Sequence, residues 1–476
     1  MADTNEHKPL VFEIDERPSI GKSIIYGFQH IFAMILGSIT TAVIIGTTVG
    51  LDTAQIGILI GYINVAVGIA TIIQVTLGIR LPIIQGSTSG HIPAYLALGS
   101  LGVSLYADPL ITMQYLGGAL LIGAVFQFSL GAFNVLKWLS RYISPITVGI
   151  IIMMIGLGLW PVITEFIGGA WHYAIVIIGL VIFFSFAFGV ITKTMSLFLA
   201  VIIAYGIAIA GTWLGWFPDK HFMYVNLRTI AESSWFTMPQ IFPWGAPKFN
   251  AGFILAMSIP YLTASLESFG DYMALSKVTY TDPPEVKRVS RGIAAEGLGS
   301  IISSILGGSA TSTFSQNIGV IRLSGVASRF VCVVAGIILL FIGVIGKLGA
   351  FMAEIPEVIL GAVYLTAFGL LAMTGLELIL RAKIDNSRNQ IIIGTSLMLG
   401  LSLPSYMEEN PVELANTSLS VFVNVILATP MLVSGLWAFI LDNILSASPE
   451  DRGMKDWLTK NSKNRQKVST RKDSPK

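Results

Sequence analysis

Two acidic residues lie inside an otherwise apolar stretch of the chain, SIPYLTASLESFGDYMAL. Glu267 and Asp271 are four residues apart, so on a helix they share one face, one turn apart. Two carboxyl groups this close in a medium of low dielectric repel each other, and the pair tends to hold a proton. We therefore expect the pair to couple proton binding to substrate binding, with Glu267 accepting N–H bonds. The alternative for Asp271 is pairing with Lys277 or capping the helix.

A second group of polar side chains follows the break in SATSTFSQNIG. The primary amide of Gln316 both donates and accepts, so it could read a planar amide-type edge with paired bonds. Ser315 stands directly before Gln316 and is a further candidate substrate ligand. Asn317 is a candidate helix N-cap or an organiser of the substrate loop. Gly319 would let a ring or a backbone come close.

Histidines in two other apolar segments could contribute to the same site. His30 lies early in the first segment and could hydrogen-bond to the carboxylates, or be a structural histidine at the membrane edge. His91 opens the third segment and, with Ser89, could line the site or serve in a helix cap.

Glu296 is a further acid in an apolar context, in SRGIAAEGLGS. It could join the carboxylate network, or pair with Arg291 or with Arg322. The sequence has no cluster of His, Cys, Asp and Glu with metal-ligand spacing and no phosphate-binding G-x-x-x-x-G-K-[ST] loop. We therefore expect no metal, no other cofactor and no enzymatic activity.

The composition indicates what must position these side chains. Of 476 residues, 54% are hydrophobic and only 12% are charged, which excludes a soluble enzyme, while a net charge of +2 offers no surface for nucleic acid. Thirteen stretches of 17 or more residues lack Asp, Glu, Lys and Arg, and each is long enough for a membrane-spanning helix. The run 297–321 contains a polar break and counts twice, which gives 14 segments.

The longest polar connection, 215–250, separates seven segments from seven. An odd number of spans per half reverses the second half, so we expect an all-α polytopic membrane protein built from two inverted repeats. Each half has an interrupted third segment, RLPIIQGSTSGHIPAYLALG and TSTFSQNIGVIRLSG, that runs from an extended stretch into a helix start. Such matched interruptions, here short strands leading into half-helices 3 and 10, indicate a binding site near the membrane midplane.

The distribution of Lys and Arg predicts the orientation. With the N-terminus in the cytoplasm, the inside loops carry 12 of these residues and the outside loops 4. The tail after Asp442 adds nine more on the inside. The sequence therefore predicts a multi-pass protein of the cell membrane with both termini cytoplasmic.

The stretch SATSTFSQNIGVIRLSGVASR resembles the signature of the nucleobase–ascorbate transporter family, also called the xanthine/uracil permeases or nucleobase:cation symporter-2 family. The family pattern of Gln or Glu, Asn, any residue, Gly and a later Thr reads here as Gln316, Asn317, Gly319 and Ser324. The stretch LESFGDYMAL is similar to the family's Glu-x-x-Gly-Asp motif. His30 matches the Gln-His pair of its first helix, and Glu296 stands where many purine members have Asp.

The resemblance implies a core domain of segments 1–4 and 8–11 that moves against a gate domain of segments 5–7 and 12–14. It also implies a homodimer. The expected boundaries are an N-terminal tail at 1–22, the core at 23–136 and 251–348, the gate at 137–214 and 349–442, an extracellular connection at 215–250 and a basic tail at 443–476.

By the same resemblance, the protein takes up a nucleobase together with a proton, with sodium as the alternative coupling ion. Glu267 and Gln316 would bond the base, and Asp271, Asn317 and His30 would support them. Gln at position 316 implies an oxidised purine such as xanthine or urate rather than uracil. An anion carrier for sulfate or bicarbonate remains an alternative, since Arg322 beside a helix start would suit an anion; a channel is a further one.

Overall fold

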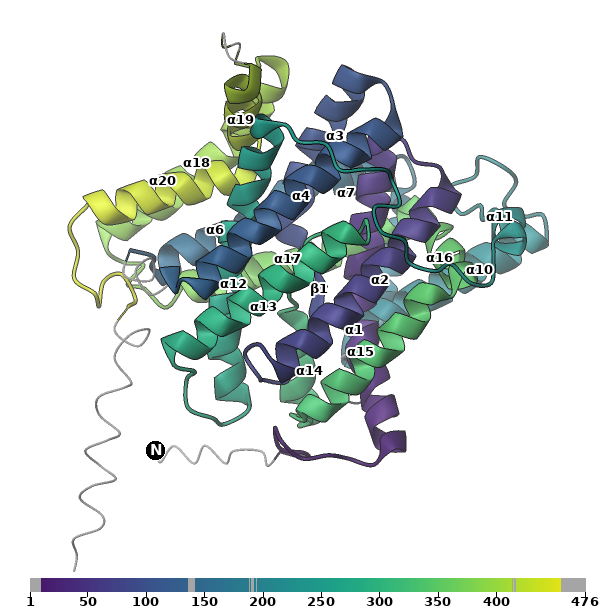
Figure 1. The fold of residues 1–476 in the computed structure, drawn as a ribbon, viewed down its shortest axis with the longest axis horizontal. Coiled ribbons are helices and arrows are strands. Elements are labelled where there is room, and N and C mark those ends of the chain that lie inside the picture. The colour runs from purple at the N-terminus through teal and green to yellow at the C-terminus, as the bar shows by residue number, and fades with distance from the viewer. Residues whose placement is uncertain are drawn as a thin grey trace, which may run out of the picture. The chain divides into compact units, whose positions relative to one another are not determined.

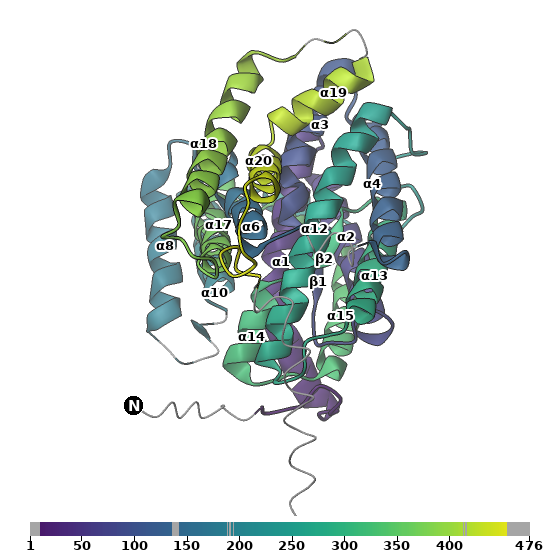
Figure 2. The ribbon, with the colours of Figure 1, turned by 90° about the vertical axis from the view of Figure 1, so that its left-hand side faces the viewer.

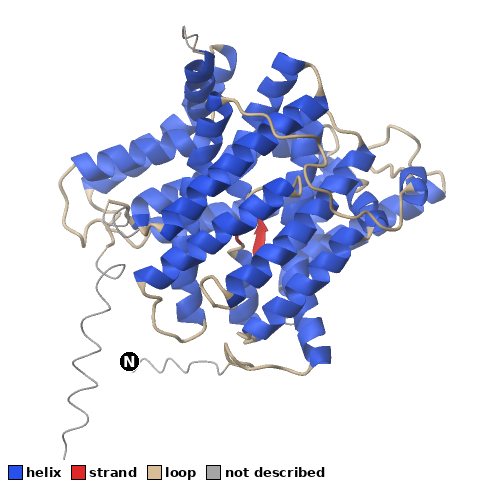
Figure 3. Ribbon diagram, viewed as in Figure 1, coloured by secondary structure: helices blue, strands red, loops and turns tan. Residues whose placement is uncertain are grey.

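A computed structural model describes residues 10–135, 142–187, 189, 192–193, 195–412, 414 and 417–454. Within these ranges the protein is helical apart from two short strands and the loops (Figure 3). The first nine residues, Lys137 and Arg141 of one predicted inside loop, and the basic tail from 455 onward lie outside the described residues.

The first half of the chain runs from α1 to α11 (Figure 1). They are α1 (Ile20–Val49), α2 (Thr53–Thr76), β1 (Gln85–Ser87), the 3-10 helix η1 (Ser89–His91), α3 (Ile92–Tyr106), α4 (Pro109–Ala132), α6 (Pro145–Gly158), α7 (Trp160–Ile167), α8 (Trp171–Phe186), α10 (Ser196–Trp213) and α11 (Leu227–Glu232).

The second half begins with the longest helix after α1. Its elements are α12 (Ala251–Val278), α13 (Val286–Ile305), β2 (Thr311–Thr313), α14 (Gln316–Ser324), α15 (Arg329–Val344), α16 (Gly346–Ala353), α17 (Glu357–Ile379), α18 (Ser387–Glu409), α19 (Thr417–Leu427) and α20 (Pro430–Ile444).

The described residues contain 8 helices long and apolar enough to cross a membrane, or up to 10 if each of two bent pairs is one span. The bends are 82° between α15 and α16 and 86° between α19 and α20. This number confirms a polytopic helical membrane protein. The division into 14 segments and two inverted repeats stays a prediction.

The contacts within the chain define two compact units. One comprises Met1–Lys137, Leu159–Phe368 and Val412–Ile426, and it contains both strands and the helices α1 to α4 and α12 to α15. The other comprises Trp138–Gly158, Gly369–Pro411 and Leu427–Lys476, in which α18 and α6 pack on α20. In this second unit the buried carboxylate of Asp442 binds Arg388 and Arg452, each at 2.8 Å.

Glycines set the packing of α2 against α15, which lie side by side in Figure 1. A Cβ added to Gly61 would lie 2.7 Å from the carbonyl oxygen of Gly343, and one added to Gly68 would lie 2.6 Å from that of Gly336. Small residues at such positions let helix backbones approach closely inside a membrane. Here glycine serves close packing of the two helices.

The two strands pair antiparallel, with Gln85 opposite Thr313 and Ser87 opposite Thr311. The sequence predicts a short strand before each interrupted helix, and the structure has one in each place: β1 leads into η1 and α3, and β2 leads into α14. Figure 2 shows the strand pair beside α12, which contacts β2, η1 and α14. The pairing therefore brings both helix starts to the helix that carries the acidic pair.

Candidate functional site

The acidic pair of α12 faces the start of α14. Glu267 and Asp271 are 9% and 8% exposed, so both carboxyl groups are largely withdrawn from solvent. Asp271 Oδ2 accepts hydrogen bonds from the hydroxyls of Thr313 at 2.6 Å and Ser315 at 2.8 Å. Ser315 also lies 3.5 Å from Glu267 Oε1. The alternatives for Asp271, a pairing with Lys277 or a capping role, are thus replaced by bonds to β2 and the residue before α14.

Glu296 of α13 is fully buried and is surrounded by hydrogen-bond donors. Oε2 accepts from Ser268 at 2.9 Å and Gln127 at 3.4 Å, while Oε1 accepts from Tyr272 and from Gln74. Glu296 thus lies in a polar network, and its part in proton coupling stays a prediction.

The two arginines suggested as partners of Glu296 lie elsewhere. Arg291 donates instead to the carbonyl of Gly78 at 2.9 Å, and Arg322 is exposed. Arg291 and Glu296 are five residues apart on one helix, a spacing that places them on different faces, whereas three or four would bring them together.

One serine joins the two acidic groups. Ser268 Oγ lies 2.9 Å from Glu296 Oε2 and also 2.9 Å from Thr313 Oγ1, which in turn donates to Asp271. A continuous hydrogen-bonded network therefore runs from Glu267 to Glu296. Sequence reasoning missed its connecting members, Ser268, Thr313, Tyr272, Gln74 and Gln127. The glutamines were the available signal, since an amide inside an apolar span needs a partner.

Three carboxyl groups gather here without a matching positive charge. In the described part of the chain, neither lysine nor arginine forms an ion pair with Glu267, Asp271 or Glu296. The same residues contain no group of three His, Cys, Asp or Glu side chains that could hold a metal ion. Buried charges without a partner are costly, so the arrangement suits groups that bind and release protons.

The start of α14 offers an open polar edge. Gln316 is its first residue, and its side chain is exposed and makes no hydrogen bond to another described residue. A Cβ added to Gly319, one turn further on, would meet nothing within 4 Å, so open space adjoins this face of α14. The amide of Gln316 is thus available to a ligand, next to Ser315 and the carboxylates that Ser315 contacts.

Asn317 is not the N-cap of α14, because the helix begins at Gln316 and Ser315 takes the cap position. The Asn317 side chain is buried, and both of its amide atoms lack a hydrogen-bond partner among the described residues. The Asn317 amide lies near the buried ring of His30 on α1. Nδ1 of His30 is also without a partner in the same part of the chain. The structure thus brings His30 to α14 but not, through a direct bond, to the carboxylates.

The start of α3 differs from that of α14. His91 is fully buried, its ring lies edge-on against Tyr261 with centroids 4.4 Å apart, and neither ring nitrogen has a hydrogen-bond partner among the described residues. Ser89 is half-buried in η1. His91 is therefore packed among aromatic side chains, and its expected contact with a substrate stays a prediction.

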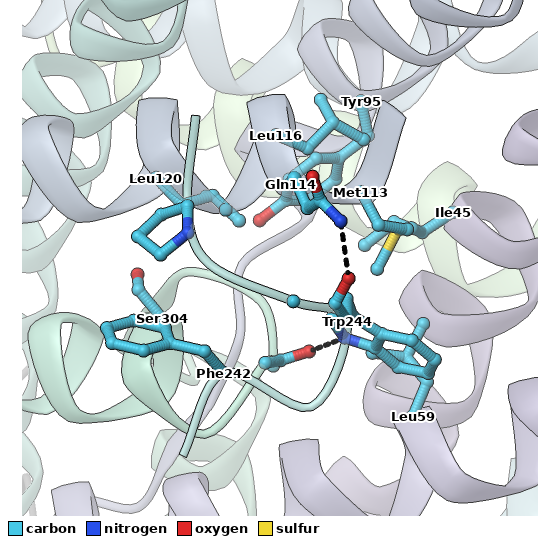
Figure 4. A pocket seen from close by; sticks show the side chains of 15 residues that line it. Ile45, Leu59, Tyr95, Met113, Gln114, Leu116, Leu120, Phe242, Trp244 and Ser304 are labelled. Atoms are coloured by element: carbon cyan, nitrogen blue, oxygen red, sulfur yellow. Dashed lines mark hydrogen bonds between the residues drawn. The ribbon is translucent and has the colours of Figure 1, made fainter. Parts of the chain in front are cut away.

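The connection between α11 and α12 closes over the end of α13. Trp244 Nε1 donates to the carbonyl of Gly307 at 2.8 Å, and Gln114 Nε2 of α4 donates to the carbonyl of Trp244 at 3.0 Å (Figure 4). A cavity beside Trp244 has a volume of about 20 Å³, room for a single water molecule. The hydrogen bond from Trp244 to Gly307 anchors the loop that leads into β2. The cavity is too small to hold a substrate.

Comparison with known proteins identifies the family. A family model, Xan_ur_permease, described as Permease family, matches residues 21–409. Solute carrier family 23 member 2 of Mus musculus is 30% identical over 498 aligned positions, covering 95% of this chain and 77% of the relative. Nucleobase-ascorbate transporter 2 of Arabidopsis thaliana is 29% identical, covering 94% and 91%. A putative purine permease of Clostridium perfringens is 28% identical, covering 94% and 95%.

Solved structures show the same fold at lower identity. The transmembrane domain of the cyanobacterial bicarbonate transporter BicA aligns with a TM-score of 0.57 at 16% identity, covering 87% of this chain and 98% of that domain. The murine anion transporter Slc26a9 aligns with a TM-score of 0.59 at 12% identity, covering 90% and 69%. With the family match over most of the sequence, the chain belongs to the nucleobase–ascorbate transporter family of membrane permeases.

Proposed function

We propose that this protein takes up a nucleobase in symport with a proton, and that the base is an oxidised purine such as xanthine or urate. The observation that carries the proposal is the contact between α12 and α14. Ser315 hydrogen-bonds to both Glu267 and Asp271, and the next residue, Gln316, presents an unpaired amide to open space. The relatives named for purines and nucleobases support the substrate class.

Each side chain has a distinct part in the proposed cycle. Glu267 accepts N–H bonds from the base, and Gln316 pairs with an amide-type edge of its ring. Gly319 leaves room for the ring beside α14. Asp271 holds Thr313 and Ser315 and so fixes the start of α14.

Proton coupling follows from the same group of residues. Because the three carboxyl groups lack a cationic partner in the described part of the chain, a proton bound by Glu267 or Asp271 offsets their repulsion. Substrate binding beside a protonated pair is then favoured over binding beside two charges. His30 of α1 supports α14 beside Asn317, and Glu296 extends the hydrogen-bonded network through Ser268.

Alternating access is part of the proposal. The helices assigned to the core carry the site, and those assigned to the gate move relative to them, in a homodimer of the cell membrane with both termini cytoplasmic. The positive-inside distribution of Lys and Arg supports this orientation.

An anion carrier is the second candidate, because the fold is shared with a bicarbonate transporter. The charge of the site argues against a small inorganic anion. Arg322, the residue that would have suited an anion, lies exposed in the last turn of α14 rather than at its start. Three buried carboxyl groups favour a ligand rich in N–H donors.

Uptake by proteoliposomes tests the proposal. Xanthine should accumulate when an inward proton gradient is imposed in sodium-free buffer, and a protonophore should abolish accumulation. Glu267→Gln should lose accumulation, whereas Glu354→Gln should keep it, because Glu354 binds the backbone of Asn226 outside the site. Competition by sulfate without competition by purines would identify an anion carrier, and uptake without counterflow would identify a channel. Full accumulation by Glu267→Gln would refute the assigned role of Glu267.

A further inference from the structure

A polar cavity of about 900 Å³ lies beside the N-terminal segment, on the face predicted to be cytoplasmic. Its charged lining consists of four arginines and two acids: Arg80, Arg288, Arg291, Arg329, Glu13 and Asp15. The guanidinium groups thus exceed the carboxylates by two positive charges. None of these residues belongs to the proposed transport site.

Three of the arginines are held in place by backbone carbonyls in the last turn of α2 and in the loop directly after it. Arg288 Nε donates to the carbonyl of Ile79 at 2.7 Å, Arg291 Nε to that of Gly78 at 2.9 Å, and Arg329 Nη1 to that of Val75 at 3.1 Å. These bonds satisfy carbonyls that have no partner within the helix. They also fix the guanidinium planes, and the terminal nitrogens of Arg291 make no hydrogen bond to any described residue.

Capping of α2 does not account for all four charges. The charge of Arg288 is repelled by Arg291, Arg329 and Arg80 and attracted by Asp15. The side chain of Arg80 forms neither a hydrogen bond nor an ion pair with another residue in the described ranges, and only its backbone, whose carbonyl accepts from Arg288 Nη2 at 3.0 Å, takes part in the cap. Like charges in one cavity destabilise the fold unless an anion joins them.

We propose that this cavity binds a phosphate-bearing anion, either the headgroup of an acidic phospholipid or a soluble phosphate ester. Arginine matches phosphate because its planar fork donates two parallel bonds to two oxygens. Arg80 and the terminal nitrogens of Arg291 are the free donors, and Thr281 adds a hydroxyl to the lining.

The N-terminal segment supplies an internal competitor for this anion. The backbone of the segment is bound to the loop after α14, through Val11 N to Gly325 O at 2.8 Å and Ala327 N to Phe12 O at 2.9 Å. This attachment places the carboxylate of Asp15 on the guanidinium of Arg329. Removal of the Asp15 charge should therefore strengthen binding of the anion.

The test uses the full-length protein in two kinds of nanodisc. In the first, the discs contain only phosphatidylcholine, and glycerol 3-phosphate is added while thermal unfolding is followed. In the second, the discs also contain phosphatidylglycerol, and no soluble phosphate is present. The variants are Arg80→Gln, Arg291→Gln and Asp15→Asn. Lys287→Gln is the control, because Lys287 is an exposed cation of α13 that does not line the cavity.

Stabilisation by glycerol 3-phosphate alone identifies a soluble ester, and stabilisation by phosphatidylglycerol alone identifies a headgroup. In either case Arg80→Gln and Arg291→Gln should each weaken the effect about tenfold, as expected for loss of a charged hydrogen bond. Asp15→Asn should strengthen it. No stabilisation in either disc, or an equal loss in Lys287→Gln, would overturn the proposal. Should Arg291→Gln fail to fold, Arg80→Gln decides the matter, since the side chain of Arg80 has no internal bond to lose.

Discussion

The segment from β1 into α3 and the segment from β2 into α14 pair in antiparallel register, yet their polar side chains have different partners. In the second segment, the hydroxyls of Thr313 and Ser315 bind Asp271. In the first segment, the side-chain polar atoms of Gln85, Thr88 and His91 have no hydrogen-bond partner among the described residues.

The difference indicates that two segments with the same backbone arrangement can place their polar side chains in different hydrogen-bonding surroundings. Both segments place a helix start beside α12, but only the second is tied to the carboxyl groups of that helix. We infer that α14 responds directly to the charge of Asp271 and that α3 mainly shapes the space opposite it. The following predictions test this difference between α14 and α3.

Asp271→Ala should have the largest effect, with uptake reduced at least about 100-fold. The substitution removes the acceptor of two charge-assisted hydrogen bonds, each worth about 1.5–3 kcal/mol, and frees the start of α14. Initial rates of xanthine uptake by proteoliposomes check this. Near-normal rates would show that α14 is positioned without Asp271. Asp219→Ala, in the exposed connection between α10 and α11, is the control and should leave the rates unchanged.

Thr313→Val should reduce uptake about tenfold while keeping the shape of the side chain. The hydroxyl of Thr313 links Ser268 with Asp271, and its loss leaves one acceptor of the buried network with a bond missing, at a cost of about 1–3 kcal/mol. The pH profile of uptake should shift as well, because the change reaches the carboxyl group. A lower rate with an unchanged pH profile would mean that Thr313 serves only packing.

The acidic pair and the amide at the helix start were predictable from the sequence, because Glu267, Asp271 and Gln316 are unusual in apolar surroundings. The two interrupted segments were predictable for the same reason, and each has its strand. The hydroxyl groups that bind these carboxyl groups were not predictable. Serine and threonine are common in membrane helices, and only the antiparallel register shows that Thr313 lies opposite Gln85 and beside α12.

Trp244→Phe should lower the free energy of unfolding by about 0.5–1.5 kcal/mol and reduce uptake a few-fold. The indole N–H holds the carbonyl of Gly307 at the entrance to β2, and phenylalanine keeps the ring but not the donor. Thermal unfolding in nanodiscs measures the stability. Trp216→Phe is the matched control, because Trp216 is exposed. Equal losses in both variants would remove any special role for the Gly307 contact.

His91→Phe should leave uptake almost unchanged and should maintain or slightly raise the thermal stability. The ring contacts Tyr261 edge-on, and both of its nitrogens lack a partner in the described part of the chain, so phenylalanine keeps the contact and removes two unsatisfied polar atoms. Uptake assays and thermal unfolding both report on this. A loss of uptake comparable to that of Thr313→Val would show that His91 reaches the substrate and that the two helix starts are chemically equivalent.

The smallest effect is expected at the end of α14, where the N-terminal segment binds the loop that follows this helix. The hydrogen bond from Arg329 lowers the pKa of the Asp15 carboxyl below its usual value. A lowered pKa in the folded state stabilises the attachment fully above the usual pKa of aspartate, about 3.9, and this contribution is lost as the pH falls through the lowered value. A spin label at Val11→Cys should therefore gain mobility only in strong acid, and by little, because Asp15 is exposed.

In Asp15→Asn the label should be slightly more mobile at neutral pH and should show no such transition. An identical transition in that variant would assign the acid sensitivity to another group. The comparison matters for the two segments because residues 10–16 hydrogen-bond through their backbone to the loop after α14 and, within the described residues, not to the loop after α3.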